Sequence, residues 1–185
     1  MSLDYSKLAK EVELKDGTRV LLRPEVPSDL EMVWEMHSTL SRKSLRFLPA
    51  PFTREKVEGW LRNLNYEHIL PVLVVLKVGG RERVVGASTL MFFQDEANRH
   101  KAEFGITVHD DYQNLGLGTI MTEEMINIAR RKGLKKVCLS VVSENRRAIK
   151  VYERCGFKVE GLMVKEHYNV HTGEYGDDYR MALLL

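Results

Sequence analysis

Residues 113–118 read Gln-Asn-Leu-Gly-Leu-Gly and lie between a predicted strand at 102–108 and a predicted helix at 116–132. The first turn of a helix presents N–H groups that have no partner within the helix, and it carries a partial positive charge. Both features suit a pyrophosphate group. Gly116 and Gly118 lack the Cβ atom that would keep a phosphate oxygen away from the backbone. The segment therefore predicts a pyrophosphate-binding loop.

Two other kinds of glycine-rich loop do not match this segment. The P-loop requires Gly-x4-Gly followed by Lys-Ser or Lys-Thr, and neither pair follows here. The dinucleotide-binding fingerprint requires a third Gly or Ala where this chain has Met121. A plain helix start with two incidental glycines stays open on spacing alone, because short glycine motifs are weakly specific.

A second motif follows downstream, where residues 145–157 give the pattern Asn-x-x-Ala-x3-Tyr-x3-Gly-Phe. In a helix Asn145, Ala148 and Tyr152 share one face, because residues three and four apart are neighbours. Together the two motifs resemble those of the GNAT superfamily of acetyltransferases, and the pair is much more specific than either motif alone.

Other segments resemble the acetyltransferase domain of the Pat-type protein-lysine acetyltransferases. They are Asp16-Gly17-Thr18, Leu22-Arg23-Pro24, Leu40-Ser41, Ser44-Leu45-Arg46-Phe47 and Ala102-Glu103-Phe104-Gly105-Ile106 with Val108. The resemblance covers about residues 12–165. The tail pattern of Gly173, Tyr175, Asp177 and Met181 is typical of many GNAT members and not of Pat in particular.

The resemblance implies an α/β (α+β) GNAT fold: a mixed, mostly antiparallel sheet of six to seven strands, with helices on both faces and splayed central strands. The residue patterns predict a compatible order of elements. Predicted strands lie at 11–14, 18–22, 71–78, 84–93, 102–108, 136–142, 158–170 and 178–185, with a turn at 171–174. Predicted helices run from a cap at 27–29 to about residue 39, from Thr53 with Val57, Trp60, Leu61 and Leu64 on one face, over 116–132, and over 145–155. Residues 1–185 are interpreted as a single domain, with 1–10 as a candidate N-terminal extension.

Acetyl-CoA is the cosubstrate that the resemblance implies. Its pantetheine arm would lie between the strands at 102–108 and 136–142, and the Val108 N–H would polarise the acetyl carbonyl. The residues placed at the cofactor are Ile106, Val108, Gln113, Asn114, Leu115, Gly116, Leu117, Gly118, Thr119 and Asn145. Ile106 and Val108 also suit ordinary core positions of a strand, and Asn145 also suits a helix cap alone.

Two residues are candidates for proton transfer. Glu103 is the candidate general base, since an acceptor lysine with a pKa near 10.4 is almost wholly protonated at pH 7. Tyr152 is the candidate general acid for the leaving thiolate. The structural alternatives are a solvent-facing or ion-paired Glu103 and a core Tyr152.

Composition restricts the partners. The formal net charge is +2 and no long Lys/Arg run occurs, so no nucleic-acid partner is expected. Cys138 and Cys155 form no Cys-x-x-Cys motif, and the six histidines show no metal-ligand spacing, so no metal is expected. The first residues lack a signal-peptide pattern and no apolar run could cross a bilayer, so no membrane contact is expected and the location is predicted to be cytoplasmic.

Three hypotheses for function follow. The first is an N-acetyltransferase that modifies a protein lysine side chain by direct amine attack in a ternary complex. The second is acetylation of a small amine, an amino acid or a protein N-terminus. The third is a non-catalytic acyl-CoA-binding sensor, which Glu103 and Tyr152 argue against. The oligomeric state is left open, with a dimer among the options.

Overall fold

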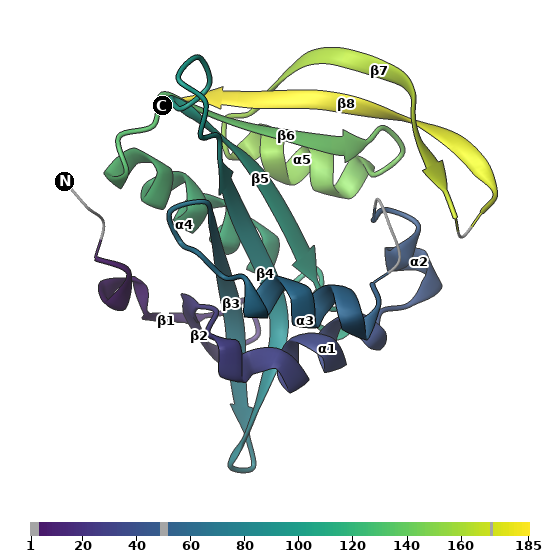
Figure 1. The fold of residues 1–185 in the computed structure, drawn as a ribbon. Helices are drawn as coiled ribbons and strands as arrows, with labels where there is room; N and C mark the ends of the chain where they lie inside the picture. The colour runs from purple at the N-terminus through teal and green to yellow at the C-terminus, as the bar shows by residue number, and fades with distance from the viewer. Residues whose placement is uncertain (1–3, 49–51, 171) are drawn as a thin grey trace.

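The centre of the computed structural model is an eight-stranded sheet with the strand order β1-β2-β3-β4-β5-β6-β8-β7 (Figure 1). The structure describes residues 4–48, 52–170 and 172–185. The strands are β1 (Lys10–Glu13), β2 (Arg19–Pro24), β3 (Ile69–Val78), β4 (Arg81–Phe92), β5 (Lys101–Val108), β6 (Lys136–Val142), β7 (Lys158–Asn169) and β8 (Glu174–Leu184). Neighbouring strands are antiparallel except β5 and β6, which are parallel. The mixed, mostly antiparallel sheet is confirmed, but it has eight strands and not six to seven, because short β1 and edge strand β7 both join it.

Helices cover both faces of the sheet, as expected. They are α1 (Leu30–Ser38), α2 (Arg42–Leu45), α3 (Arg54–Arg62), α4 (Leu117–Arg131) and α5 (Arg146–Arg154), with 3-10 turns η1 (Tyr5–Leu8), η2 (Pro27–Asp29) and η3 (Asp110–Tyr112). One core layer packs α4 and α5 against the sheet, around Met121, Met125 and Phe157. The other packs α1 and α3 against β3 and β4, around Met36 and Leu73.

Local sequence explains where α4 begins and ends. Gly116 precedes its first turn with a φ of 88°, and Gly133 follows its last turn with a φ of 79°. Glycine adopts this left-handed conformation without the steric cost that a Cβ atom imposes. Arg130 and Arg131 stand in the last turn, where a positive charge is favourable. The predicted helix at 116–132 is thus confirmed.

Three sequence expectations differ from the structure. The four-residue α2 was not expected, because one turn is too short to show helical periodicity. Trp60 does not share the buried face of α3 with Val57 and Leu61, since it is 48% exposed and packs edge-to-face on Phe52. Strand β8 begins at Glu174 and not near residue 178, because its first residues pair with β7.

The candidate extension and the predicted turn at 171–174 are each described only in part. Of residues 1–10, the structure describes 4–10, in which Leu8 is buried and the Tyr5 hydroxyl donates to the Tyr66 carbonyl at 3.1 Å. The predicted turn at 171–174 includes His171, which lies outside the described residues. Within the described ranges, no helix is long and apolar enough to cross a membrane.

The sheet face that carries α1 and α3 includes exposed residues on β4, β5 and β6. On this face Met91 of β4 is 46% exposed, and Gly105 of β5 and Ser140 of β6 are exposed. Core residues Phe104 and Leu139 alternate with them and point to the opposite face, toward α4 and α5. Polar side chains at the odd-numbered positions of β5 therefore face solvent beside α1 and α3.

A buried carboxyl lies between β2 and α1. Glu25 is 7% exposed and neighbours Asp29, whose two oxygens each accept from Arg23 at 2.7 Å. Burial and the negative charge of Asp29 raise the pKa of Glu25 to about 7. The positive charge of Arg23 lowers this pKa but does not cancel the increase. In the folded protein this group therefore holds its proton over a pH range in which the unfolded chain has lost it.

We expect Glu25→Gln to stabilise the protein at pH 8 and to leave stability unchanged near pH 4. Because the folded pKa lies above the unfolded value of 4.5, wild-type stability falls as pH rises from about 4.5 to about 7, and Gln removes this loss. The gain at pH 8 is at most ~3 kcal/mol, at 1.36 kcal/mol per pKa unit. Urea unfolding at both pH values measures it. An equal difference at pH 4 and pH 8 would show that Glu25 acts through packing instead of charge.

Candidate active site

The loop between η3 and α4 presents a run of free backbone donors. Asn114 and Gly116 both have positive φ, 67° and 88°. Within the described part of the chain, the N–H groups of residues 114–118 donate to no acceptor, and helical bonds begin with the N–H of Thr119 to the Gly116 carbonyl at 3.1 Å. Successive N–H groups in such a turn form a concave nest that binds anions. This backbone fits the pyrophosphate of acetyl-CoA.

Gln113 supports this loop through its side chain. Its amide nitrogen donates to the Val108 carbonyl at 3.0 Å and to Ser44 Oγ at 3.1 Å. Its amide oxygen accepts from Arg147 of α5 at 2.6 Å. The polar atoms of this side chain are therefore engaged with β5, α2 and α5, which fixes the loop between them and does not leave them facing a ligand.

The two glycines of the loop differ in what they do. At Gly116 a Cβ atom would meet the Lys15 side chain at 3.3 Å, and the positive φ disfavours any other residue. At Gly118, which lies within α4, a Cβ atom would reach only Val151 of α5, at 4.0 Å. Gly116 is thus required by the backbone, whereas Gly118 is not.

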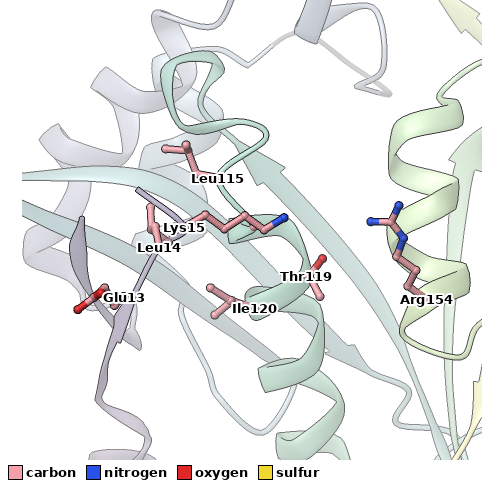
Figure 2. A pocket seen from close by; sticks show the side chains of 8 residues that line it. Glu13, Leu14, Lys15, Leu115, Thr119, Ile120 and Arg154 are labelled. Atoms are coloured by element: carbon pink, nitrogen blue, oxygen red, sulfur yellow. The ribbon is translucent and has the colours of Figure 1, made fainter. Parts of the chain in front are cut away.

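Two basic residues that sequence reasoning did not select lie beside the loop. Lys15 and Arg154 line a cavity of about 370 Å³ together with Leu115, Gly116 and Thr119. Figure 2 shows the Lys15 side chain extending across the start of α4 from one side, with Arg154 of α5 on the other. The Lys15 N–H donates to the Leu115 carbonyl at 3.1 Å, which holds the β1–β2 turn against the loop. Neither residue belongs to a motif, so only the folded chain brings these charges to the phosphate loop.

Strands β5 and β6 separate from a common end (Figure 1). They pair only from Lys101 to Glu103 with Lys136 to Cys138. On the other side of β5, the His109 N–H donates to the Val85 carbonyl at 3.0 Å. Because hydrogen-bonded and non-hydrogen-bonded pairs alternate along antiparallel strands, the N–H groups of Ile106 and Val108 point away from β4 into the gap. The expected splay is confirmed, and the gap offers backbone groups to an extended pantetheine arm.

Glu103 lies at the vertex of this gap, on the open face of the sheet. It forms a two-point ion pair with Arg180 of β8, at 2.6 Å and 2.7 Å. Arg180 also donates to Ser140 Oγ at 3.2 Å. The side chains are 19% and 28% exposed, so the pair is sheltered but accessible. The structure thus shows that the candidate base Glu103 is paired with a cation, Arg180, which lies 77 positions away in the sequence.

Tyr152 lies on the other face, in the core layer of α4 and α5. Its ring packs edge-to-face on Phe104 of β5, with ring centroids 6.1 Å apart, and against Phe157 at 6.0 Å. Burial raises the pKa of the Tyr152 hydroxyl above its usual range, with a further contribution from Cys155. The hydroxyl therefore stays protonated but is a weak acid.

The comparisons with known proteins agree with this geometry. A model of the GNAT acetyltransferase domain matches residues 19–158. The chain belongs to the GNAT acetyltransferase family.

Among the relatives of this chain is the L-amino acid N-acetyltransferase AaaT of Escherichia coli K12, 37% identical over 54% of this chain and 60% of that protein. The GNAT-family acetyltransferase structure from Streptococcus pneumoniae has a TM-score of 0.73 at 26% identity, covering 90% of this chain and 99% of that one. The GNAT domain of S. lividans PAT has a TM-score of 0.77 at 19% identity, covering 96% and 97%. The last likeness is one of fold.

The remaining GNAT-type candidates have structural contacts of their own. The Asn145 side chain accepts from the Ala148 N–H at 3.2 Å and so caps α5, which is the helix-cap role given above as the alternative to cofactor binding. The Leu117 side chain is buried, with 1% exposed, so only its backbone is available to a ligand.

Burial raises the pKa of the Cys138 thiol, which makes it a poor nucleophile. Among the described residues, no group of three or more His, Cys, Asp or Glu side chains could hold a metal ion.

We expect Tyr152→Phe to keep the affinity for acetyl-CoA and to slow turnover. The ring contacts with Phe104 and Phe157 are preserved, and only the hydroxyl is lost. A general acid contributes ~10²–10⁴-fold, and the raised pKa of this hydroxyl places the effect at the lower end. Tyr175→Phe, at a tyrosine that is 66% exposed and packs on Tyr168, is the matched control. Turnover equal to wild type at every pH would make Tyr152 a core residue only.

Proposed function

We propose that this chain is an acetyl-CoA-dependent N-acetyltransferase in which an amine attacks the acetyl group directly within a ternary complex. One observation supports this most: β5 is unpaired toward β6 from just after Glu103 to Val108, and the free N–H groups of residues 114–118 follow it in the chain. When bound, acetyl-CoA supplies a thioester-activated acetyl group. The loop would bind its pyrophosphate, with Lys15 and Arg154 adding positive charge.

Residues of β5 would orient and activate the reactants. The N–H groups of Ile106 and Val108 face the gap, and that of Val108 would donate to the acetyl oxygen. The Val108 carbonyl is already occupied by Gln113, which keeps this end of β5 in place. Since these donors are backbone groups, side-chain changes at Val108 would matter little.

Glu103 would take the proton of the acceptor ammonium. The amine nitrogen then forms the bond to the acetyl carbon and loses its second proton to solvent, the C–S bond breaks, and sulfur leaves with the electron pair and is protonated by solvent or by Tyr152. Because Arg180 binds both carboxylate oxygens, Glu103 must give up part of that ion pair to accept a proton. The acceptor must therefore compete with Arg180 for Glu103.

Two acceptor classes have support. Pat-like segments such as Ala102-Glu103-Phe104 favour a protein lysine, as the sequence predicts. The amino-acid-acetylating relative AaaT favours a small amine. The cytoplasmic location stays a prediction from the sequence.

Calorimetry with CoA and acetyl-CoA, followed by measurement of free thiol released with a panel of amines, tests the proposal. We expect binding of both cofactors and thiol release that depends on an added amine. Binding without acetylation of any amine would favour the sensor alternative, and absence of binding would remove the proposal.

A further inference from the structure

The Glu103–Arg180 pair lies at the point where an acceptor would meet the acetyl group. Glu103 opposes Cys138 in the last residue pair that joins β5 to β6. Arg180 opposes Ser140 on the other side of β6, one step farther along the gap. Both side chains are thus on the open face of the sheet, next to the gap between β5 and β6.

Space is available beside this pair. Gly105 is the next residue of β5 on the same face, it is exposed, and no described atom lies within 4 Å of the position a Cβ would take. Met91, which opposes Glu103 on β4, is 46% exposed. A small molecule could therefore rest on the sheet between an apolar side chain and the charged pair.

The charges of the pair discriminate between classes of amine. A simple cation, such as a lysine side chain or a polyamine, is attracted by Glu103 but repelled by Arg180 at nearly the same distance. A zwitterion meets an opposite charge at both residues. Arginine is suited to this task because its planar guanidinium binds a carboxylate through two parallel N–H groups. Arg180 also keeps its contact with Ser140, which would hold the guanidinium when Glu103 turns to the substrate.

We propose that the acceptor is a free α-amino acid, whose carboxylate binds Arg180 and whose ammonium binds Glu103. The inference rests on the proposed N-acetyltransferase function. One ammonium proton passes to Glu103, the nitrogen lone pair forms the bond to the acetyl carbon, the C–S electron pair leaves on sulfur, and the second proton lost by nitrogen balances the proton that the sulfur takes up. The product carries only the carboxylate, so it loses its attraction to Glu103 and is released more readily than a zwitterion.

The wild-type protein provides the first test. Free thiol release is measured with L-amino acids, the corresponding amino acid carboxamides, spermidine, and a lysine peptide with blocked ends. We expect kcat/KM for the best amino acid to exceed that of its carboxamide by ~10–100-fold, the effect of one charged hydrogen-bonded contact. Equal or better use of the carboxamide, spermidine or the peptide would overturn the inference but leave the N-acetyltransferase function intact. Acetylation of no amine would remove both.

Variants provide the second test. Arg180→Gln should raise KM for the amino acid ~10–100-fold, lower KM for its carboxamide because that cation no longer competes with Arg180 for Glu103, and leave acetyl-CoA affinity by calorimetry unchanged. Arg180→Lys keeps the charge without the two-point geometry, so its loss should be smaller. Lys136→Gln, which removes a cation that pairs with Glu160 at 2.6 Å near the same strands, is the control and should change neither KM. An unchanged preference for the free carboxylate in a folded Arg180→Gln protein would overturn the role of Arg180.

Discussion

Glu103→Gln is expected to lower kcat by ~10²–10⁴-fold, the usual contribution of a general base, while acetyl-CoA affinity is unchanged. The substitution alters neither the free N–H groups of residues 114–118 nor those of Ile106 and Val108. It leaves the acceptor amine mostly protonated with no group to take its proton. The loss should shrink as pH rises toward the pKa of the amine, because free neutral amine then replaces the missing base.

The ion pair with Arg180 requires a control for charge and stability. Glu160→Gln removes a carboxylate that pairs with Lys136 of β6 and not with Arg180. It should leave kcat and its pH profile unchanged. A folded Glu103→Gln protein that behaves like the Glu160→Gln control in both respects would assign Glu103 a structural role only.

Gly116→Ala is expected to weaken acetyl-CoA binding by ~10–100-fold, measured by calorimetry. The φ of 88° at this position is strained for any residue with a Cβ, at a cost of ~1–2 kcal/mol. The new Cβ also approaches Lys15 within 3.3 Å. Relief of the strain would turn the N–H groups of the loop away from a common centre, and each lost charged hydrogen bond costs ~1.5–3 kcal/mol.

The other end of the same helix offers a matched control for this change. Gly133 follows α4 with a φ of 79°, and a Cβ there would meet no described atom within 4 Å. Gly133→Ala should therefore lose a similar amount of stability in urea unfolding and bind acetyl-CoA as the wild type does. Equal affinity in the two variants would mean that Gly116 shapes the helix start and not the phosphate site.

The sequence predicted those parts of the site that depend on neighbouring residues. The turn at residues 113–118, the start of α4 and the Asn145 cap each lie within a few positions, so motif spacing could locate them, while the phosphate-binding role of the turn stays a prediction. Lys15 and Arg180 could not be found in this way. Lys15 reaches the loop from about a hundred positions earlier, and Arg180 reaches Glu103 across β6, so both depend on strand pairing that no local pattern contains.

The same limit applies to the fold. Long strands and α4 were predicted because their apolar residues repeat over many positions. One-turn α2 offered no such repeat, and Trp60 was misplaced because helical spacing alone does not show which flank of a face is covered. In contrast, Glu103 was located correctly in a strand, but its ion pair follows only from the position of β8 between β6 and β7.

The strand order also determines when half of the sheet can assemble. Strand β7 is synthesised before β8, yet it joins the sheet only through β8, which occupies the place beside β6. Until β8 is available, β6 exposes an unpaired edge and β7 has no partner in the sheet, a situation in which strands are prone to wrong pairing. A chain that is cut before residue 174 therefore loses two strands from the sheet, not one. It also loses Arg180, so the Glu103 carboxylate of such a chain lacks its ion-pair partner.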